Sequence, residues 1–341
     1  MPESSSNSPS EEQRLPGGPP AFLRVDTQYA EWGKQHPDLI YSSLPDSVQG
    51  VMDNPRHVGP GPVPPGGAPP AMPGPDETMQ EILKGMSQSW EDIRPYFTES
   101  GQTLFEPIPG LWDDLNLYVN EKWDDVRIGF TELPQKMIFR GKFTLFPYAL
   151  VVIQEMKKDK VDLAPGLSAQ QEVRRVYAGL GLVVNDIARW LRQHGVRCQS
   201  NHPMGGLVNT PSLAAKAGLG WQGRSGILVT PEFGPRVRLA PVFIEHKVFE
   251  FTDNLDHQWI EKHCETCRKC EKECPGQAIY TEKVINVDGV PGVGAIRTCI
   301  DVTKCLGPFR QTMGCMVCIK VCPFSQDDNA YTRLKAAVDN K

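Results

Sequence analysis

The chain of 341 residues lacks the features that would place it in a membrane or on a nucleic acid. No run of about 18 apolar residues occurs, so no transmembrane segment is expected. Lys and Arg (36) do not outnumber Asp and Glu (41), and a net charge of -5 leaves no basic stripe for DNA or an anionic membrane. The sequence shows no internal repeat and opens without a secretory or twin-arginine signal. We therefore expect a cytoplasmic protein.

Glycine and proline, at 31 residues each, are concentrated in the first quarter of the chain. Residues 1–75 are predicted to form a Pro/Gly-rich, largely disordered N-terminal arm, in which 22–57 carry enough apolar side chains to dock on the main body. The compact body is expected at 76–255. A cysteine-rich domain is expected at 256–330, followed by a C-terminal tail at 331–341.

Hydrophobic periodicity predicts that helices and strands alternate in the body. Helices are expected at 77–86, 111–122, 168–192 and 211–217, and strands at 125–130, 148–153 and 227–230. The strand at 148–153 is apolar on both faces, which is typical of a central strand. This order predicts an α/β or α+β body whose sheet is covered by helices.

Two cysteine runs are the strongest signal. They are Cys264-x2-Cys267-x2-Cys270-x3-Cys274-Pro275 and Cys305-x9-Cys315-x2-Cys318-x3-Cys322-Pro323. The first has the spacing of a bacterial ferredoxin, in which three cysteines hold one 4Fe-4S cluster and the fourth reaches across to the other. By this rule, cluster 1 should take Cys264, Cys267, Cys270 and Cys322, and cluster 2 should take Cys274, Cys305, Cys315 and Cys318.

The alternatives for these cysteines are a zinc ribbon and a disulfide framework. A zinc ribbon uses two Cys-x2-Cys knuckles, whereas eight cysteines fall here in two sets of four, each ending in Cys-Pro. Disulfides are disfavoured because closely spaced cysteines in a cytosolic protein more often bind metal. Cys198 and Cys299 have no ligand partner at suitable spacing and are interpreted as ordinary buried or semi-buried thiols.

A glycine-dense segment lies upstream of the cysteines. Gly218, Gly220 and Gly223 are positions where the backbone could approach a bulky ligand closely, although a turn that merely packs is an equal alternative. The Gly-x-Gly here is not a dinucleotide fingerprint following a strand, so a nicotinamide or flavin Rossmann site is not favoured.

Taken with the two Cys-Pro motifs, the segments 216–226 and 230–238 resemble the cobalamin-dependent reductive dehalogenases and the related epoxyqueuosine reductases. The match covers roughly residues 110 to 325, with a weaker one in 22–97. The resemblance implies an α+β fold in which a nitroreductase-like core at 76–255 holds base-off cobalamin and a ferredoxin-like module at 256–330 supplies electrons from two 4Fe-4S clusters. It also implies cobalamin contacts at Gly218, Gly220, Trp221, Gly223, Gly226, Thr230 and Arg236.

The same resemblance assigns three catalytic positions. Tyr177 corresponds to a tyrosine that donates a proton, and Arg224 to the basic residue that stabilises its phenolate. Asn209 stands where epoxyqueuosine reductases carry a catalytic aspartate, and this departure favours the dehalogenase side. A guanidinium beside a phenol would make it a usable acid at neutral pH, since arginine keeps its own proton.

Each of these residues also has a structural interpretation. Tyr177 could be a core residue on an apolar helix face, Arg224 could cap a carbonyl or pair with an acid, and Trp221 could be either a pocket wall or a packing residue. His202 lacks the Asp-x-His-x-x-Gly cobalamin motif, so we do not expect it to ligate cobalt.

The leading hypothesis is a cytoplasmic corrinoid and iron-sulfur dependent reductase that removes halide from a small organohalide. Its electron donor would be a reduced ferredoxin, a flavodoxin or a reductase. One alternative is an epoxyqueuosine-type reductase of a non-halogenated substrate, which the acidic composition and Asn209 disfavour. The other is a non-catalytic electron-transfer or cobalamin-binding protein. The sequence leaves the substrate and the oligomeric state undetermined.

Overall fold

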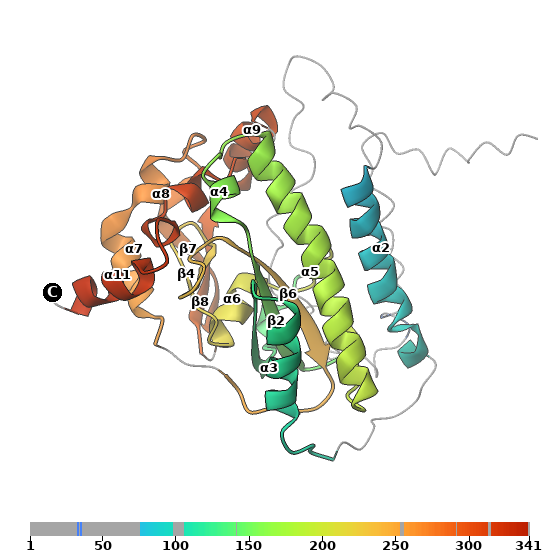
Figure 1. Cartoon of the computed structure of the whole chain (residues 1–341). Coiled ribbons are helices and arrows are strands. Elements are labelled where there is room, and N and C mark those ends of the chain that lie inside the picture. The colour runs from blue at the N-terminus through green and yellow to red at the C-terminus, as the bar shows by residue number, and fades with distance from the viewer. Residues whose placement is uncertain are drawn as a thin grey trace, which may run out of the picture.

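The computed structural model of the chain describes residues 33, 35, 76–97, 106–140, 142–252, 256–290, 292–312 and 315–339 (Figure 1). The predicted N-terminal arm lies outside this part of the chain, residues 33 and 35 aside. Within it, no helix is both long and apolar enough to cross a bilayer. The predicted boundaries of the body, the cysteine-rich domain and the tail remain predictions.

An antiparallel sheet forms the centre of the body. Its strands are β1 (Val126–Glu132), β2 (Tyr148–Glu155), β6 (Val237–Ile244) and β3 (Cys198–Ser200), in the order β1-β2-β6-β3. The predicted central strand is confirmed as β2, which pairs with both β1 and β6 and is buried over most of its length. The apolar run at 148–153 supplies side chains to both faces of the sheet, as the period of two requires.

Helices cover one face of this sheet. α3 (Leu111–Lys122) and α5 (Leu167–Gln193) bury their apolar stripes against alternate β2 residues, Leu150 and Val152. α2 (Glu77–Glu91) lies along the outer side of α5 (Figure 1). Each expected helix of the body exists, with ends that shift by a few residues except at 111–122, where both ends agree.

The other face packs against α6 (Thr210–Lys216), the small β4 (Trp221–Gln222) and β5 (Leu228–Val229) ribbon, and the C-terminal part of the chain. That part contains α7 (Trp259–Cys267), α8 (Lys269–Lys272), α9 (Val302–Gln311), α10 (Val317–Lys320) and α11 (Ala330–Asp339). A long hairpin of β7 (Ile279–Val290) and β8 (Gly294–Ile300) separates the two cysteine runs. The mixed α+β architecture is confirmed.

A buried polar network attaches α2 to α5. Asn185 donates to the Gly85 carbonyl at 2.8 Å, and its Oδ1 accepts from the hydroxyls of Ser89 at 2.7 Å and Ser200 at 2.8 Å. Asn185 is 4% exposed, so water cannot replace these partners. The network therefore fixes the positions of α2 and β3 relative to α5.

The substitution Asn185→Ala should lower the free energy of unfolding by about 2 kcal/mol, because it leaves two hydroxyls and a carbonyl buried without their shared partner. Urea denaturation measures the loss. Asn116→Ala, which removes an amide that bonds only the Trp112 carbonyl one turn away, is the matched control. Equal losses in the two variants would contradict this interpretation of the network.

His202 is enclosed where α2 and α5 approach each other. A side chain placed on Gly181 would come within 2.1 Å of its Nε2, and one on Gly85 within 3.2 Å. Its Nδ1 accepts the Met204 amide at 3.1 Å, whereas Nε2 is buried and has no hydrogen-bond partner among the described residues. Burial lowers the pKa of His202 to about 3.

This depressed pKa predicts an acid-sensitive fold. In the unfolded chain His202 binds a proton near its ordinary pKa of about 6.5, so acid favours unfolding. Stability should therefore fall as pH drops below 6.5, by up to ~1.4 kcal/mol per pH unit, until the folded pKa is reached. His202→Asn should flatten this slope in urea titrations at several pH values, and His194→Asn, at the exposed end of α5, should not. A slope that persists in His202→Asn would contradict the assignment.

Candidate functional site

The two cysteine runs have the same local backbone. In the first, Arg268 (φ 51°) follows Cys267 in the left-handed region and precedes the single turn of α8. In the second, Met316 (φ 48°) follows Cys315 and precedes the single turn of α10. Such a left-handed residue ahead of a helical turn directs backbone N–H groups into a concavity that suits an anion.

Two buried thiols, Cys322 and Cys318, show which cysteines lie near one another, and Cys270 lies near both of them. Burial raises the pKa of Cys322, and the thiols of Cys264, Cys270 and Cys267 raise it further. The last cysteine of the second run therefore lies near three cysteines of the first.

The other group gathers around Cys318. Burial, together with the neighbouring thiols of Cys270, Cys305, Cys315 and Cys274, raises the pKa of Cys318 to about 12. Burial likewise raises the pKa of Cys305, with Cys315 and Cys274 as the neighbouring thiols. Cys274 thus lies near the second run, as the ferredoxin spacing predicts.

The thiols fit an iron-sulfur cluster better than a single ion. Among the described residues, no three His, Cys, Asp or Glu side chains form a group that could hold one metal ion. A 4Fe-4S cluster needs four thiolates spread around a larger cube, and iron would compensate the cost of burying their charge. The two sets of four have this chemistry. The number of clusters remains a prediction.

The glycine-dense turn lies beside the cysteines, but its glycines face the chain itself. A side chain on Gly220 (φ +148°) would meet the Val229 carbonyl at 2.1 Å. One on Gly223 would lie 3.7 Å from the Cys264 sulfur, and one on Gly226 3.1 Å from Cys299. Internal packing thus accounts for these three glycines. Cobalamin contacts at this turn remain predictions.

Tyr177 lies on the side of α5 that faces the cysteine-rich part. Tyr177, Ile227 after the glycine turn, and Cys318 each pack against the same small buried apolar cluster. The guanidinium carbon of Arg238, on β6, lies 5.3 Å from the centroid of the Tyr177 ring. Arg238 also extends to the Met316 sulfur at 3.9 Å. A phenol with a cation over its ring and a cysteine of the predicted cluster 2 therefore border the same apolar cluster.

Arg224 has a different partner from the one the resemblance implies. Its Nε donates to Glu271 at 2.6 Å, and its Nη2 donates to the Thr281 carbonyl. Hydrogen bonds from Arg268, and then from Arg224, lower the pKa of Glu271 to about 2. Arg224 thus ties the glycine turn to α8 and β7, beside Cys270. Its catalytic role remains a prediction.

The structure places the other predicted residues in packing roles. Asn209 caps α6, accepting the Ser212 amide at 3.1 Å. Thr230 accepts the Phe233 amide at 3.1 Å and closes the turn at 230–234. Trp221 is 8% exposed within the apolar core. None of these contacts tests a functional role, so the roles of these residues remain predictions.

Gly218 and Arg236 also contact the C-terminal part. The Gly218 carbonyl lies 3.1 Å from His257 Nε2. Arg236, 2% exposed, donates to Glu155 at 3.0 Å and to the Ser325 carbonyl at 3.1 Å. This buried arginine joins β6 and β2 to the segment just after Cys322. Cobalamin contacts at these two positions remain predictions.

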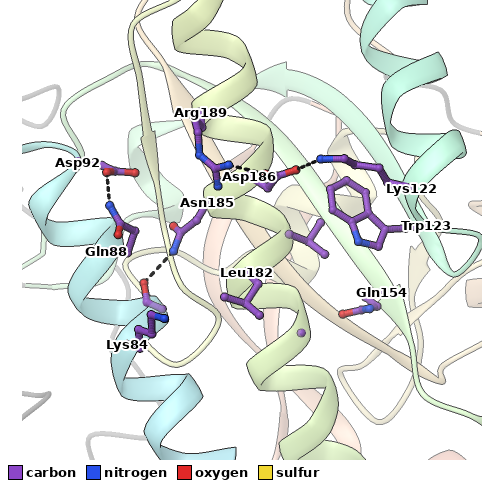
Figure 2. Close-up of a pocket in the computed structure, with 13 residues that line it drawn as sticks. Lys84, Gln88, Asp92, Lys122, Trp123, Gln154, Leu182, Asn185, Asp186 and Arg189 are labelled. Carbon is purple, nitrogen blue, oxygen red and sulfur yellow. Dashed lines mark hydrogen bonds and ion pairs between the residues drawn. The ribbon is translucent and has the colours of Figure 1, made fainter.

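A cavity of about 720 Å³ lies on the opposite side of α5 from Tyr177. Figure 2 shows Lys84 and Gln88 from α2, Leu182 and Asp186 from α5, and Trp123 from the end of α3 around it. None of the predicted catalytic, cobalamin-binding or cysteine residues lines this cavity. It is therefore separate from the candidate site.

Sequence reasoning missed Arg238 and Glu271, the two charged residues that complete these contacts. Arg238 is on the side of β6 that carries Ala240 and Val242 in the core shared with α5, since side chains alternate along a strand with a period of two. No pattern in the sequence signals that Glu271 meets Arg224, because the two are 47 residues apart. The left-handed Arg268 and Met316 could have been found, since both occupy the same position within Cys-x2-Cys.

Comparison with known proteins connects this site to two groups of reductases. The chain is 38% identical to a tetrachloroethene reductive dehalogenase of Sulfurospirillum multivorans over 125 residues, 36% of this chain and 24% of that protein. It is 31% identical to the Dehalobacter restrictus tetrachloroethene reductive dehalogenase over 135 residues, again 24% of that protein. An epoxyqueuosine reductase of Gloeobacter violaceus is 25% identical over 167 residues, 47% of this chain and 50% of that one.

The solved structure of the catabolic reductive dehalogenase NpRdhA is similar with a TM-score of 0.55 and 22% identity, over 77% of this chain and 41% of that one. No protein family description matches the chain. The chain spans about a quarter of the curated dehalogenases and about half of that epoxyqueuosine reductase. It is therefore a sequence relative of the reductive dehalogenases and epoxyqueuosine reductases, and it shares the fold of a reductive dehalogenase over about three quarters of its length.

Proposed function

We propose that this chain is an iron-sulfur and corrinoid dependent reductase that removes halide from a small organohalide. The placement of Tyr177 carries the proposal: Arg238 lies over its ring, and it packs against the same apolar cluster as Cys318, so a proton source lies on the side of a predicted electron source. The similarity to tetrachloroethene reductive dehalogenases supports the reaction class. Cytoplasmic location is part of the proposal.

The overall reaction takes R–X, two electrons and one proton to R–H and halide. The carbon–halogen bond breaks, a C–H bond forms, and the carbon gains the two electrons. The clusters would supply these electrons one at a time, held by the eight cysteines. The Tyr177 hydroxyl would supply the proton, and Arg238 over the ring would stabilise the phenolate that remains. We assign this part to Arg238, since Arg224 is paired with Glu271.

The corrinoid in the proposal comes from the relatives. A reductive dehalogenase structure that matches this chain with a TM-score of 0.55 and 20% identity is described as suggesting a mechanism for B12-dependent dehalogenation. When bound, base-off cobalamin would supply two-electron chemistry at cobalt. Its contacts on this chain remain predictions.

The reductase can be tested after anaerobic reconstitution with iron, sulfide and cobalamin, using a reduced viologen as donor and halide release from haloarenes and haloalkanes as the readout. Tyr177→Phe should lower turnover about 100-fold, and Arg238→Gln about tenfold with a shift in the pH profile. Tyr148→Phe, which keeps a ring stacked on Phe130, is the matched control. Full turnover by Tyr177→Phe would remove Tyr177 from the reaction.

Arg224→Gln separates the two arginine assignments. If Arg238 serves Tyr177, the Arg224 variant should keep the pH profile of the parent chain, because its partners are Glu271 and Thr281. A shift in the pH profile with Arg224→Gln and none with Arg238→Gln would return the role to Arg224.

The crossing of the cysteine runs predicts which ligands belong together. Cys322→Ser and Cys318→Ser should each lower the iron content from about eight to about four per chain, because each removes one ligand of a different cluster. Electron paramagnetic resonance of the reduced variants should show one remaining cluster, with a different spectrum in each variant. Cys299→Ala should keep both clusters. Stoichiometric zinc in place of iron and sulfide would contradict the assignment.

A further inference from the structure

Two exposed apolar side chains lie next to a predicted ligand of cluster 2. Leu306 and Phe309 on α9 are 38% and 37% exposed, and Leu306 directly follows Cys305. Three residues apart on a helix, they occupy the same side. Burying them against another protein would therefore bring that protein close to the Cys305 sulfur.

A second exposed apolar pair flanks the segment that supports Cys318. Leu163 and Leu167, at the start of α5, are 56% and 54% exposed. Between them, the Ala164 carbonyl accepts Lys320 from α10 at 2.7 Å. Figure 1 shows α4 (Lys158–Val161), the start of α5 and α9 at the same end of the molecule.

The segments of cluster 1 have no such surface. In the described part of the chain, no large apolar side chain on α7 or α8 is exposed. Cys264 and Cys322 instead pack against the main apolar core. Of the two predicted clusters, cluster 2 therefore has the apolar surroundings that a partner could cover.

Charge around this surface is opposite in sign to that of the whole chain. Residues 157–167 and 301–320 contain six Lys and Arg side chains and three Asp side chains, whereas the chain has a net charge of -5. Arg310 lies one turn beyond Leu306 on α9. A basic zone on an acidic protein attracts an acidic partner locally and repels it elsewhere, which speeds and orients association.

We propose that Leu163, Leu167, Leu306 and Phe309, called the entry face, form the docking surface for a small acidic electron-donor protein. Cluster 2 would then be the first acceptor. One electron leaves the reduced donor and one enters the oxidised cluster, and no other reactant is required. The inference rests on the proposed function, because it needs the clusters to be present.

Stopped-flow bleaching of the cluster absorbance tests the entry face in the full chain with both clusters loaded. Two reductants are compared, an acidic bacterial two-cluster ferredoxin reduced beforehand and dithionite, which needs no docking. The variants are Leu306→Ser with Phe309→Ser, and Leu163→Ser with Leu167→Ser. Val284→Ser with Ile285→Ser, on the β7–β8 hairpin, is the control, since these two are 57% and 58% exposed. Iron and sulfide contents verify that every variant holds its clusters.

Both entry-face variants should slow bleaching by ferredoxin about tenfold and leave the dithionite rate unchanged, whereas the hairpin control should match the parent chain at both. Arg310→Glu should slow the ferredoxin reaction at low salt and weaken its salt dependence. Parent rates in the entry-face variants, or an equal slowing in the hairpin control, would overturn the inference. So would an equal slowing with dithionite, which would mean an altered cluster. If dithionite bleaches no cluster in the parent chain, the proposed function is wrong, and the proposed docking role of the entry face is then wrong as well.

Discussion

The candidate site depends on the hydrogen bonds that the buried guanidinium of Arg236 makes. Arg236 directly precedes β6 and bonds Glu155 on β2 and the Ser325 carbonyl, three residues after Cys322. Removing the Glu155 carboxylate would leave this guanidinium, which is 2% exposed, buried and uncompensated, which is costly in a protein interior. The sheet and the end of the second cysteine run are therefore joined through an arginine that is buried away from solvent.

Backbone packing reinforces the same junction. Gly234 (φ +56°) lies where any side chain would come within 2.2 Å of the Phe324 carbonyl. Ser325, fully buried, donates its hydroxyl to the Ile319 carbonyl on α10 at 2.6 Å. Because α10 begins at Val317 and carries Cys318, the sheet sets the position of that thiol. Tyr177 is carried by the 27-residue α5 and packs against the same small apolar cluster as Cys318, so two rigid elements set where the phenol and the thiol lie.

Short sequence patterns predict many of the helices and strands. The features they do not predict depend on pairing between residues far apart in the sequence. The apolar run at 148–153 is enough to identify β2, whereas the ligand sets that the spacing of the cysteines implies remain predictions. The β7–β8 hairpin escapes prediction, because 279–300 lack a strict apolar alternation and their pairing contains register shifts. The resemblance joins Arg224 to Tyr177, yet a family motif specifies positions and not partners. In the folded chain Arg224 pairs with Glu271, and Arg238 lies over the ring of Tyr177. Neither pairing can be inferred from the sequence alone.

The different surroundings of the two thiol groups give the predicted electron path a direction. Cys264 and Cys322 pack against the main core, and Gly223 brings the glycine turn close to the Cys264 sulfur. Cys305 lies on α9 between exposed side chains, whereas Cys318 packs against the same apolar cluster as Tyr177. In the proposed function, an electron that enters through the second group of thiols would therefore arrive on the side of the molecule that holds the proton donor. Bringing electron and proton together avoids the separation of charge in a low-dielectric interior, which Coulomb's law makes expensive.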